Sequence, residues 1–272
     1  MTRKQITRLI IIAAVLYLCG TVVSLRYRPE LDGIEYEEIP SIEYERALPR
    51  HSYKWEALET YQGKKSYQYD NIKAKWGIDV SKHQEKISWQ KVKKDGIDFA
   101  MIRVGYRGYG NGAIKEDPTF TYNMNSANRV GIDVGLYFFS QAISVEEAKE
   151  EAQFVLQQIQ GHKVTYPIVF DMEFVAGKDR ITHLTREEKT QITKAFCEVI
   201  EQAGYKPMIY GSRHWLQDVI TLEELSDYEV WLAEYSDVPS FPYAFKMWQY
   251  TDSGTVDGIS GGVDMNLWFV EE

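Results

Sequence analysis

Two carboxylates end the most apolar segment of the chain, and their spacing suits acid–base chemistry. The segment reads Pro167-Ile-Val-Phe-Asp171-Met-Glu173. Side chains two positions apart on a strand point the same way, so we expect Asp171 and Glu173 to face one side. Ionisable groups held close together push their pKa values apart, so that one stays protonated while the other is ionised. Hydrolysis of a glycosidic bond needs such a pair, although a bare Asp-x-Glu is also compatible with a solvated strand end.

Two further acids stand at the ends of other apolar segments. Asp79 follows Ile78, and Asp264 lies between Val263 and Met265. Each has an alternative role, because Asp79 can cap the turn that follows it and Asp264 can belong to a turn after two glycines. Both are nevertheless candidates for the same chemistry, because they lie at the ends of predicted strands.

The elements that must position these acids alternate between strands and helices from Trp76 onward. Such alternation is typical of βαβ units and a parallel sheet. The predicted strands cover residues 76–80, 99–106, 134–140, 166–173, 206–212, 228–235, 246–252 and 263–269. The predicted helices lie around 88–95, 118–130, 144–160 and 185–203. The pattern predicts an α/β fold, a TIM-like barrel whose last strands have lost their helices, with chemistry at the carboxyl ends of the strands.

Aromatic side chains near the predicted strand ends have two interpretations. Most buried aromatic residues belong to a core, whereas those at the mouth of a barrel can stack on sugar rings. We predict that Tyr137, Tyr210 and Trp248 are walls of a pocket. The other members of this aromatic set are Tyr106, Trp231 and Tyr235.

The composition favours carbohydrate over nucleic acid as a ligand. The chain has 272 residues, a net charge of -9 and a pI near 5.2. It shows no stripe of Lys and Arg of the kind that holds a phosphate backbone. The five histidines are scattered without metal-ligand spacing, and neither Cys19 nor Cys197 has the surroundings of a nucleophile. We therefore expect no nucleic-acid partner, no metal and no cofactor.

The N-terminus carries a targeting signal. An uncharged run over residues 9–25 follows Arg3, Lys4 and Arg8. Its length of about 17 residues lies between a signal-peptide core and a transmembrane helix. The residues after it offer no small-x-small cleavage site, so we favour an uncleaved single-pass membrane anchor over secretion after cleavage. The basic flank predicts that residues 1–8 are cytoplasmic and that the rest of the chain is extracytoplasmic.

The segment after the anchor is expected to be a stalk. Residues 26–75 combine charge, tyrosine and proline with no sustained apolar period. We expect them to be extended or partly helical and to hold the following domain, residues 76–272, away from the membrane. The domain is expected to act as a monomer.

From Trp76 to the C-terminus the chain resembles the family 25 glycoside hydrolases, a lysozyme family of bacteria and bacteriophages. The matching motifs, in family order, are Gly77-Ile-Asp79-Val-Ser81 with Trp89, Asp98-Phe-Ala-Met-Ile-Arg103 with Gly105-Tyr106, Gly135-Leu-Tyr137-Phe-Phe, Asp171-Met-Glu173, Tyr210, Trp231-Leu-Ala-Glu-Tyr235, Trp248-Gln249-Tyr250 and Gly262-Val-Asp264. Many members have a histidine where this chain has Phe138. If that position touches the substrate, the sugar specificity of this chain is expected to differ.

The resemblance implies a modified barrel, (β/α)5(β)3, that hydrolyses the β-1,4 bond between N-acetylmuramic acid and N-acetylglucosamine in peptidoglycan. Glu173 matches the family's general acid, and Asp171 matches the stabilising or nucleophilic carboxylate beside it. Asp79 and Asp264 match the aspartates of the first and last strands in the same pocket. The candidates for substrate binding are Tyr137, Tyr210, Trp248, Arg103, Tyr106 and Trp231.

Two other functions stay open at the level of sequence. A chitinase-type N-acetylglucosaminide hydrolase also ends a strand with Asp-x-Glu, but its longer acidic motif requires Asp where this chain has Val169. A cell-wall-binding barrel without activity has no reason to keep a desolvated, mutually repelling carboxylate pair. The sequence therefore favours a peptidoglycan hydrolase over both.

Overall fold

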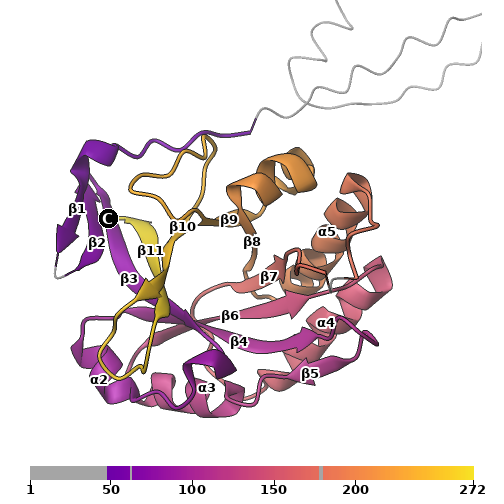
Figure 1. Ribbon diagram of the computed structural model, residues 1–272, viewed down its shortest axis with the longest axis horizontal. Coiled ribbons are helices and arrows are strands. Elements are labelled where there is room, and N and C mark those ends of the chain that lie inside the picture. Colours follow the sequence, from indigo (N-terminus) through magenta and orange to yellow (C-terminus); the bar gives the residue numbers. More distant parts are fainter. Residues whose placement is uncertain (1–47, 62, 178–179) are drawn as a thin grey trace, which may run out of the picture. The chain divides into compact units, whose positions relative to one another are not determined.

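The structure is a computed structural model that describes residues 48–61, 63–177 and 180–272, and these form an α/β barrel (Figure 1). The barrel strands follow the order β3-β4-β6-β7-β8-β9-β10-β11, and β11 pairs back with β3. Their bounds are Ile72–Val80, Phe99–Arg107, Asp133–Ser140, Ile168–Met172, Pro207–Ser212, Glu229–Ala233, Met247–Gly254 and Val263–Glu271. Neighbouring strands are parallel except at β11, which is antiparallel to β10 and β3. Each barrel strand corresponds to a predicted one; the short β5 (Ile114–Glu116), which pairs with the end of β4, was not predicted.

Helices cover the outside of the first half of the barrel (Figure 1). They are α2 (Trp89–Lys94), α3 (Phe120–Arg129), α4 (Val145–Gln158) and α5 (Arg186–Gln202). The strand β8 is followed by the short helical turns η3 (Trp215–Val219) and η4 (Leu222–Leu225). Within the described residues no helix separates β9, β10 and β11. Five β/α units therefore precede three further strands, as the family resemblance implies.

Local sequence signals set where the long helices begin. The Ser144 hydroxyl accepts a hydrogen bond from the backbone N–H of Glu147 at 3.3 Å, at the start of α4. At the start of α5, Thr185 and Glu188 form a capping box in which each side chain accepts from the other residue's backbone N–H. Such caps satisfy N–H groups that have no partner inside the helix.

The barrel interior is filled at its amino-terminal end. Phe99 and Tyr166 stack with ring centroids 4.6 Å apart, and Trp268 lies 4.9 Å from Tyr166. Gly77 is required there, because a Cβ atom at that position would lie 2.1 Å from the Phe99 ring. A ligand can therefore enter only from the carboxyl ends of the parallel strands, where β/α barrels place their active sites.

Residues 48–75 do not form the predicted stalk. They contain the helical turn η1 (Trp55–Ala57) and a hairpin of β1 (Leu58–Tyr61) and β2 (Lys64–Tyr69), and β2 pairs with β3. Tyr53 stacks on Phe269 of β11 at 4.1 Å, and its hydroxyl donates to the Phe245 carbonyl oxygen at 2.7 Å. The predicted boundary at residue 75 thus falls inside β3. Short strands that pack on a distant part of the chain leave no periodic pattern, which is why this segment resembles a stalk in sequence.

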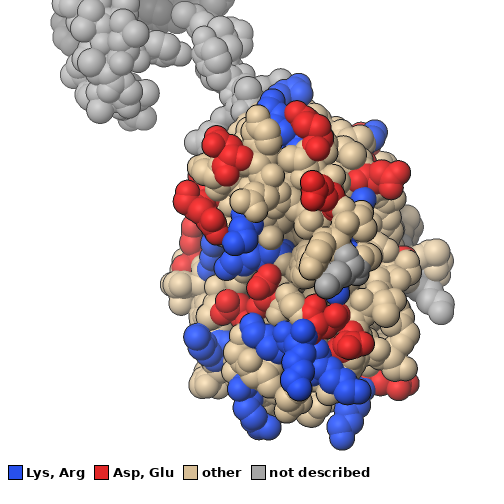
Figure 2. Space-filling model, turned by 90° about the vertical axis from the view of Figure 1, so that its left-hand side faces the viewer, with Lys and Arg blue, Asp and Glu red and all other residues tan. Residues whose placement is uncertain are grey.

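The side of the molecule that carries β1, β2 and α2 has an uneven charge distribution (Figure 2). Lys and Arg side chains gather in its lower part, at the level of α2, whose Lys91, Lys93 and Lys94 are exposed. Acidic and basic side chains are mixed in the upper part, at the level of the hairpin. The hairpin region therefore presents no extended surface of one sign.

The predicted anchor at 9–25, the cytoplasmic segment 1–8 and the first part of the predicted stalk lie outside the described residues. Across residues 48–61, 63–177 and 180–272, no helix has the length and apolarity needed to span a bilayer. The membrane anchor stays a prediction.

Candidate active site

A pocket of about 370 Å³ lies at the carboxyl ends of the barrel strands and contains all four predicted acids. Asp79 comes from β3, Asp171 and Glu173 from the end of β7, and Asp264 from β11. The other lining residues are Ser81, His83, Gln84, Arg103, Tyr137, Phe139, Tyr210, Trp231, Tyr235 and Gln249. No group of three His, Cys, Asp or Glu side chains in the described part of the chain is arranged to hold a metal ion.

Asp79 and Asp264 lie directly opposite each other on the antiparallel pair β3–β11. Asp79 is buried, and its Oδ2 accepts hydrogen bonds from Nδ2 of Asn266 at 2.8 Å and Nε2 of Gln249 at 2.9 Å. Burial raises the pKa of Asp79 to about 6, against the lowering effect of these two hydrogen bonds. Burial, followed by the charge of Asp79, raises the pKa of Asp264 to about 8. Both acids therefore keep protons at pH values that ionise an exposed aspartate.

The surroundings of Asp171 and Glu173 also disfavour the ionised form of each carboxyl group. Burial raises the pKa of Asp171 well above its usual range, and the charges of Glu173 and Asp79 add to this effect while Arg103 opposes it. Burial and then the charge of Asp79 raise the pKa of Glu173. Oδ1 of Asp171 is buried and has no hydrogen-bond partner among the described residues. A protonated acid beside an ionised one is the arrangement that general acid catalysis requires.

Hydrogen bonds connect the Asp79 carboxylate to the aromatic walls of the pocket. The hydroxyls of Tyr210 and Tyr235 both donate to Oε1 of Gln249, at 3.0 Å and 2.8 Å. Gln249 in turn donates to Asp79. The carboxylate is thus oriented by an amide that is itself fixed by two phenols, which makes the site rigid before any ligand arrives.

Gln249 and Asn266 are site residues that the sequence analysis did not single out. Asn266 is completely buried, donates to Asp79 and accepts from Nε1 of Trp231 at 2.8 Å. Its position two residues after Asp264 on β11 was the available signal, because residues i and i+2 of a strand lie on one face. Gln249 belongs to the family motif Trp248-Gln249-Tyr250, in which Trp248 rather than Gln249 was predicted to line the pocket.

Trp248 does not line the pocket, contrary to the prediction. It is fully buried on the outer side of the barrel, where its Nε1 donates to the Glu234 carbonyl oxygen at 2.8 Å and its ring centroid lies 5.8 Å from that of Trp55. The neighbouring Met247 packs inside the barrel and Gln249 lines the pocket. The alternation of side chains along β10 explains why Gln249 rather than Trp248 lines the pocket, since adjacent residues face opposite sides.

Tyr137 and Tyr210 line the pocket as predicted. Of the other candidates for substrate binding, Trp231 and Arg103 also line the pocket, whereas Tyr106 does not. The Arg103 guanidinium lies 5.6 Å from the centroid of the Tyr106 ring. Tyr106 therefore contacts Arg103 through a cation–π interaction and does not line the pocket itself.

Asp117 holds Arg103 in place. Its Oδ2 accepts from Nε of Arg103 at 2.8 Å and lies 2.7 Å from Nη2. Asp117 is completely buried, and its Oδ1 accepts from the backbone N–H and the hydroxyl of Thr119. A guanidinium held by a buried carboxylate presents a fixed positive charge to the pocket.

Phe138, which replaces the histidine of many family members, does not touch the pocket. It is completely buried, and its ring centroid lies 6.0 Å from that of Phe154 in α4. The next residue, Phe139, lines the pocket instead. An altered sugar specificity was expected only if position 138 touches the substrate, and the buried Phe138 does not reach the pocket.

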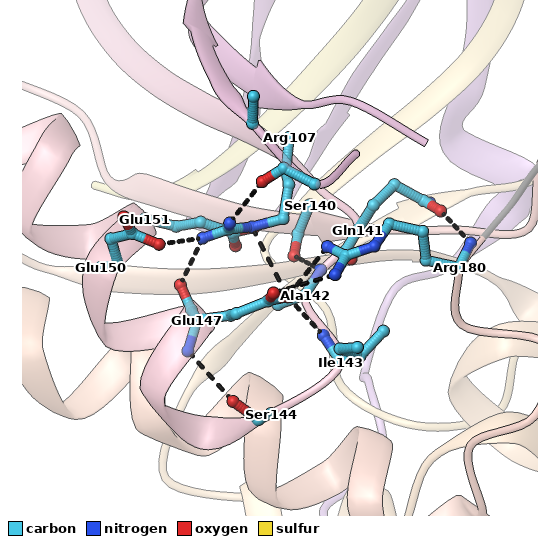
Figure 3. Close-up of polar contacts among 12 residues, drawn as sticks. Arg107, Ser140, Gln141, Ala142, Ile143, Ser144, Glu147, Glu150, Glu151 and Arg180 are labelled. Carbon is cyan, nitrogen blue, oxygen red and sulfur yellow. Dashed lines mark hydrogen bonds and ion pairs between the residues drawn. The ribbon is translucent and has the colours of Figure 1, made fainter. Parts of the chain in front are cut away.

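Partly buried polar contacts join Gln141, Glu147 and Arg180 (Figure 3), and Gln141 also contacts Glu173. Nε2 of Gln141 donates to the Glu173 carbonyl oxygen at 3.1 Å, and Oε1 of Gln141 accepts from the backbone N–H of Arg180 at 2.9 Å. The Arg180 guanidinium donates to the Gln141 carbonyl oxygen at 3.0 Å and to both carboxylate oxygens of Glu147 at 2.9 Å. Gln141 is completely buried. One side chain therefore fixes both ends of the segment that begins with Glu173.

Arg107 extends these contacts to the rest of α4 (Figure 3). Its guanidinium donates to Glu151 at 2.7 Å, to Glu150 at 2.8 Å and to the Gly112 carbonyl oxygen at 2.6 Å. Burial raises the pKa of Glu151 to about 7, although the contacts with Ser140 and Arg107 oppose this. The polar network joins β4, the end of β6 and α4 behind the carboxylate pair.

The fold and the pocket define a glycoside hydrolase, because paired carboxylates with raised pKa values lie at the carboxyl ends of the strands of an α/β barrel. The family model of the glycosyl hydrolases family 25 matches residues 78–259. The chain belongs to this family.

Relatives and solved structures agree with this assignment. The chain is 29% identical to the Escherichia coli protein YegX over 195 residues, which cover 71% of this chain and 68% of YegX. It is 27% identical to lysozyme M1 of Streptomyces globisporus over 200 residues, which cover 70% of this chain and 66% of that protein. The structure of the modular autolysin LytC of Streptococcus pneumoniae, in complex with a synthetic peptidoglycan ligand, matches with a TM-score of 0.65 at 26% identity. That match covers 78% of this chain and 52% of LytC.

Proposed function

We propose that the protein is a muramidase that hydrolyses the β-1,4 bond between N-acetylmuramic acid and N-acetylglucosamine in peptidoglycan. The observation that carries the proposal is the convergence of four acids in one pocket of a family 25 barrel. The similarity to a lysozyme and to an autolysin with a peptidoglycan ligand supports the choice of substrate.

Glu173 is the general acid in this proposal. Burial and the negative charge of Asp79 keep its carboxyl protonated at higher pH than usual. The proton passes to the glycosidic oxygen as the bond to the anomeric carbon breaks. The leaving sugar therefore departs as an alcohol rather than as an alkoxide.

Asp171 acts in its ionised form, which the charge of Arg103 favours against the effect of burial, and supplies negative charge to the sugar that remains. Its Oδ1 is buried and has no hydrogen-bond partner among the described residues, so no protein donor there neutralises the charge of this atom. Positive charge develops at the anomeric carbon in the transition state, and a carboxylate already in place stabilises it without reorganisation. Asp79 and Asp264 act indirectly, through their charge and by orienting the other groups in the pocket.

A chitinase-type activity fits the pocket less well. The position at which that class requires an additional aspartate is Val169, which is completely buried in the apolar interior of the barrel beside Met101 and Met208. A carboxylate there would be desolvated without a partner. The four acids in the pocket likewise argue against a barrel that only binds the wall.

The products of digestion test the proposal. Purified peptidoglycan is digested, the new reducing ends are reduced with borohydride, and the terminal sugars are identified by mass spectrometry. Cleavage of the proposed bond gives reduced N-acetylmuramic acid. Reduced N-acetylglucosamine would assign the other bond, and the absence of new reducing ends would leave a binding protein.

We also propose that the chain is anchored in the cell membrane by residues 9–25, with the barrel outside. The uncharged run and the basic residues before it support this topology. Protease added to intact cells should release the barrel, while a tag at the N-terminus stays with the membrane fraction. Recovery of a soluble chain that starts near residue 26 would instead indicate cleavage of the signal.

A further inference from the structure

A second groove, of about 840 Å³, lies beside the catalytic pocket. Tyr235 lines both and is 53% exposed, so the two spaces meet at its side chain. The groove is lined by Thr60, Gly63 and Lys65 of the hairpin, by Ser236 and Asp237 after β9, and by residues 250–255 at the end of β10. The hairpin precedes the residues matched by the family model, 78–259, so one wall of this groove lies outside the matched region.

The hairpin wall is held firmly against the barrel. Nζ of Lys65 donates to the Asp237 carbonyl oxygen at 2.8 Å and lies 5.5 Å from the centroid of the Trp248 ring. The Lys65 carbonyl oxygen accepts from Nε1 of Trp76 at 2.7 Å. These contacts join β2 to β3, β10 and the loop after β9. The groove is therefore preformed, which lowers the entropic cost of binding a ligand.

The chemistry of the lining suits a neutral ligand rich in hydroxyl and amide groups. The lining hydroxyls belong to Thr60, Ser236, Thr251, Ser253 and Thr255. The charged side chains are two carboxylates, Asp237 and Asp252, and the Lys65 ammonium, so no single sign dominates. The exposed Tyr235 ring at the junction can stack on the apolar face of a sugar.

We propose that this groove binds further sugar residues of the glycan strand whose scissile bond occupies the catalytic pocket. The inference rests on the proposed muramidase function and deepens it. A strand that leaves the pocket past Tyr235 enters the groove, and the hairpin contacts it there. The enzyme consequently cleaves long glycan strands more efficiently than short oligosaccharides.

The test compares kcat/KM on peptidoglycan tetrasaccharide and on long glycan strands, both stripped of peptides. Thr60→Trp and Thr255→Trp each place a bulky ring in the groove, from the hairpin and from the β10 end. Thr121→Trp, on the exposed surface of α3, is the matched control. The ratio of kcat/KM on long strands to that on tetrasaccharide should fall about tenfold in both groove variants, equivalent to about 1.4 kcal/mol. The control should keep the wild-type ratio.

Each alternative outcome contradicts the proposal in a distinct way. A wild-type enzyme without length preference, or groove variants with an unchanged ratio, would show that the strand does not pass through the groove. A third substrate, long strands that keep their peptides, extends the comparison, and a preference seen only on this substrate would assign the groove to the peptide stem. Failure to cleave any of these substrates would contradict the proposed function itself. Thermal unfolding of each variant verifies that it is folded.

Discussion

Burial raises the pKa values of all four pocket acids, and the charge of Asp79 adds to the rise in the other three, which are Asp171, Glu173 and Asp264. The hydrogen bonds that Asp79 accepts from Gln249 and Asn266 offset only part of this cost. Proteins retain such unfavourable arrangements where chemistry needs them, commonly with a loss of stability. The four acids should therefore differ from surface acids in both activity and stability when they are replaced.

Glu173→Gln removes the proton donor while preserving size and most hydrogen bonding. We expect turnover of purified peptidoglycan, measured as released reducing ends, to fall at least ~100-fold, as is typical for loss of a general acid. Glu187→Gln, at an exposed position in α5, is the matched control and should have wild-type turnover. A folded Glu173→Gln variant with more than about a tenth of wild-type turnover would contradict the assignment, given that ~100-fold minimum.

Asp264→Asn should stabilise the folded protein in a pH-dependent manner. The pKa of Asp264 rises from 3.8 to about 8 on folding, so ionisation opposes folding above the lower value. The destabilisation is absent below about pH 4, grows between pH 4 and 8 and is complete above pH 8. Thermal unfolding should therefore show a higher Tm for Asp264→Asn at pH 8.5 and an unchanged Tm at pH 3.5. An equal difference at both pH values would show that charge is not the cause.

At the scale of elements, the position of Glu173 depends on the network behind β7. Glu173 follows the last residue of the strand, so the strand alone does not fix its backbone. Gln141, which follows β6, donates directly to the Glu173 carbonyl oxygen. Arg180 in turn contacts Gln141 and pairs with Glu147 of α4 (Figure 3). The catalytic geometry is therefore supported by elements that do not touch the pocket.

Arg180→Ala should impair catalysis through the position of Glu173. We expect kcat to fall about 10- to 100-fold with a smaller change in KM, because small displacements of a catalytic group are costly. Arg180→Lys should recover part of kcat, since an ammonium can still pair with Glu147. Arg129→Ala, an exposed position at the end of α3, is the control. A loss in Tm with unchanged kcat would mean that Arg180 only stabilises the fold.

At the scale of the whole molecule, residues 48–75 pack on the barrel, although their sequence pattern predicts part of a separate stalk. The Tyr53 ring stacks on Phe269, and Tyr67 is buried at 3% exposure against the same β11 residue. Trp55 packs on Phe245. These contacts cover the outer face of β10 and β11, where no helix lies in the described residues. The N-terminal aromatic residues take the place of the missing helices.

A chain that starts at residue 76 should therefore be much less stable than one that starts at residue 48. Removal of one large aromatic side chain from a core typically costs about 3–5 kcal/mol, and this truncation removes several. Chemical denaturation of the two purified chains would measure the difference. Equal free energies of unfolding would show that residues 48–75 are dispensable and that the barrel is complete without them.

The sequence by itself determined the barrel strands and the four acids. Each barrel strand is marked by a short apolar run, and strands separated by amphipathic helices must lie parallel in one sheet. Parallel strands bring their carboxyl ends to one edge, so acids at the ends of β3 and β7 were bound to meet. Local pattern carries this information because it depends only on neighbouring residues.

Only the tertiary structure decided which of two adjacent strand residues faces the pocket. It also decided which distant segments pack against the barrel and the site. Alternation separates Trp248 from Gln249, but closure of the barrel selects the glutamine for the pocket. The hairpin and the Arg180 contacts join residues far apart in the chain, such as Lys65 with Asp237. Pairings of this kind are set by three-dimensional packing, which leaves no periodic trace in the sequence.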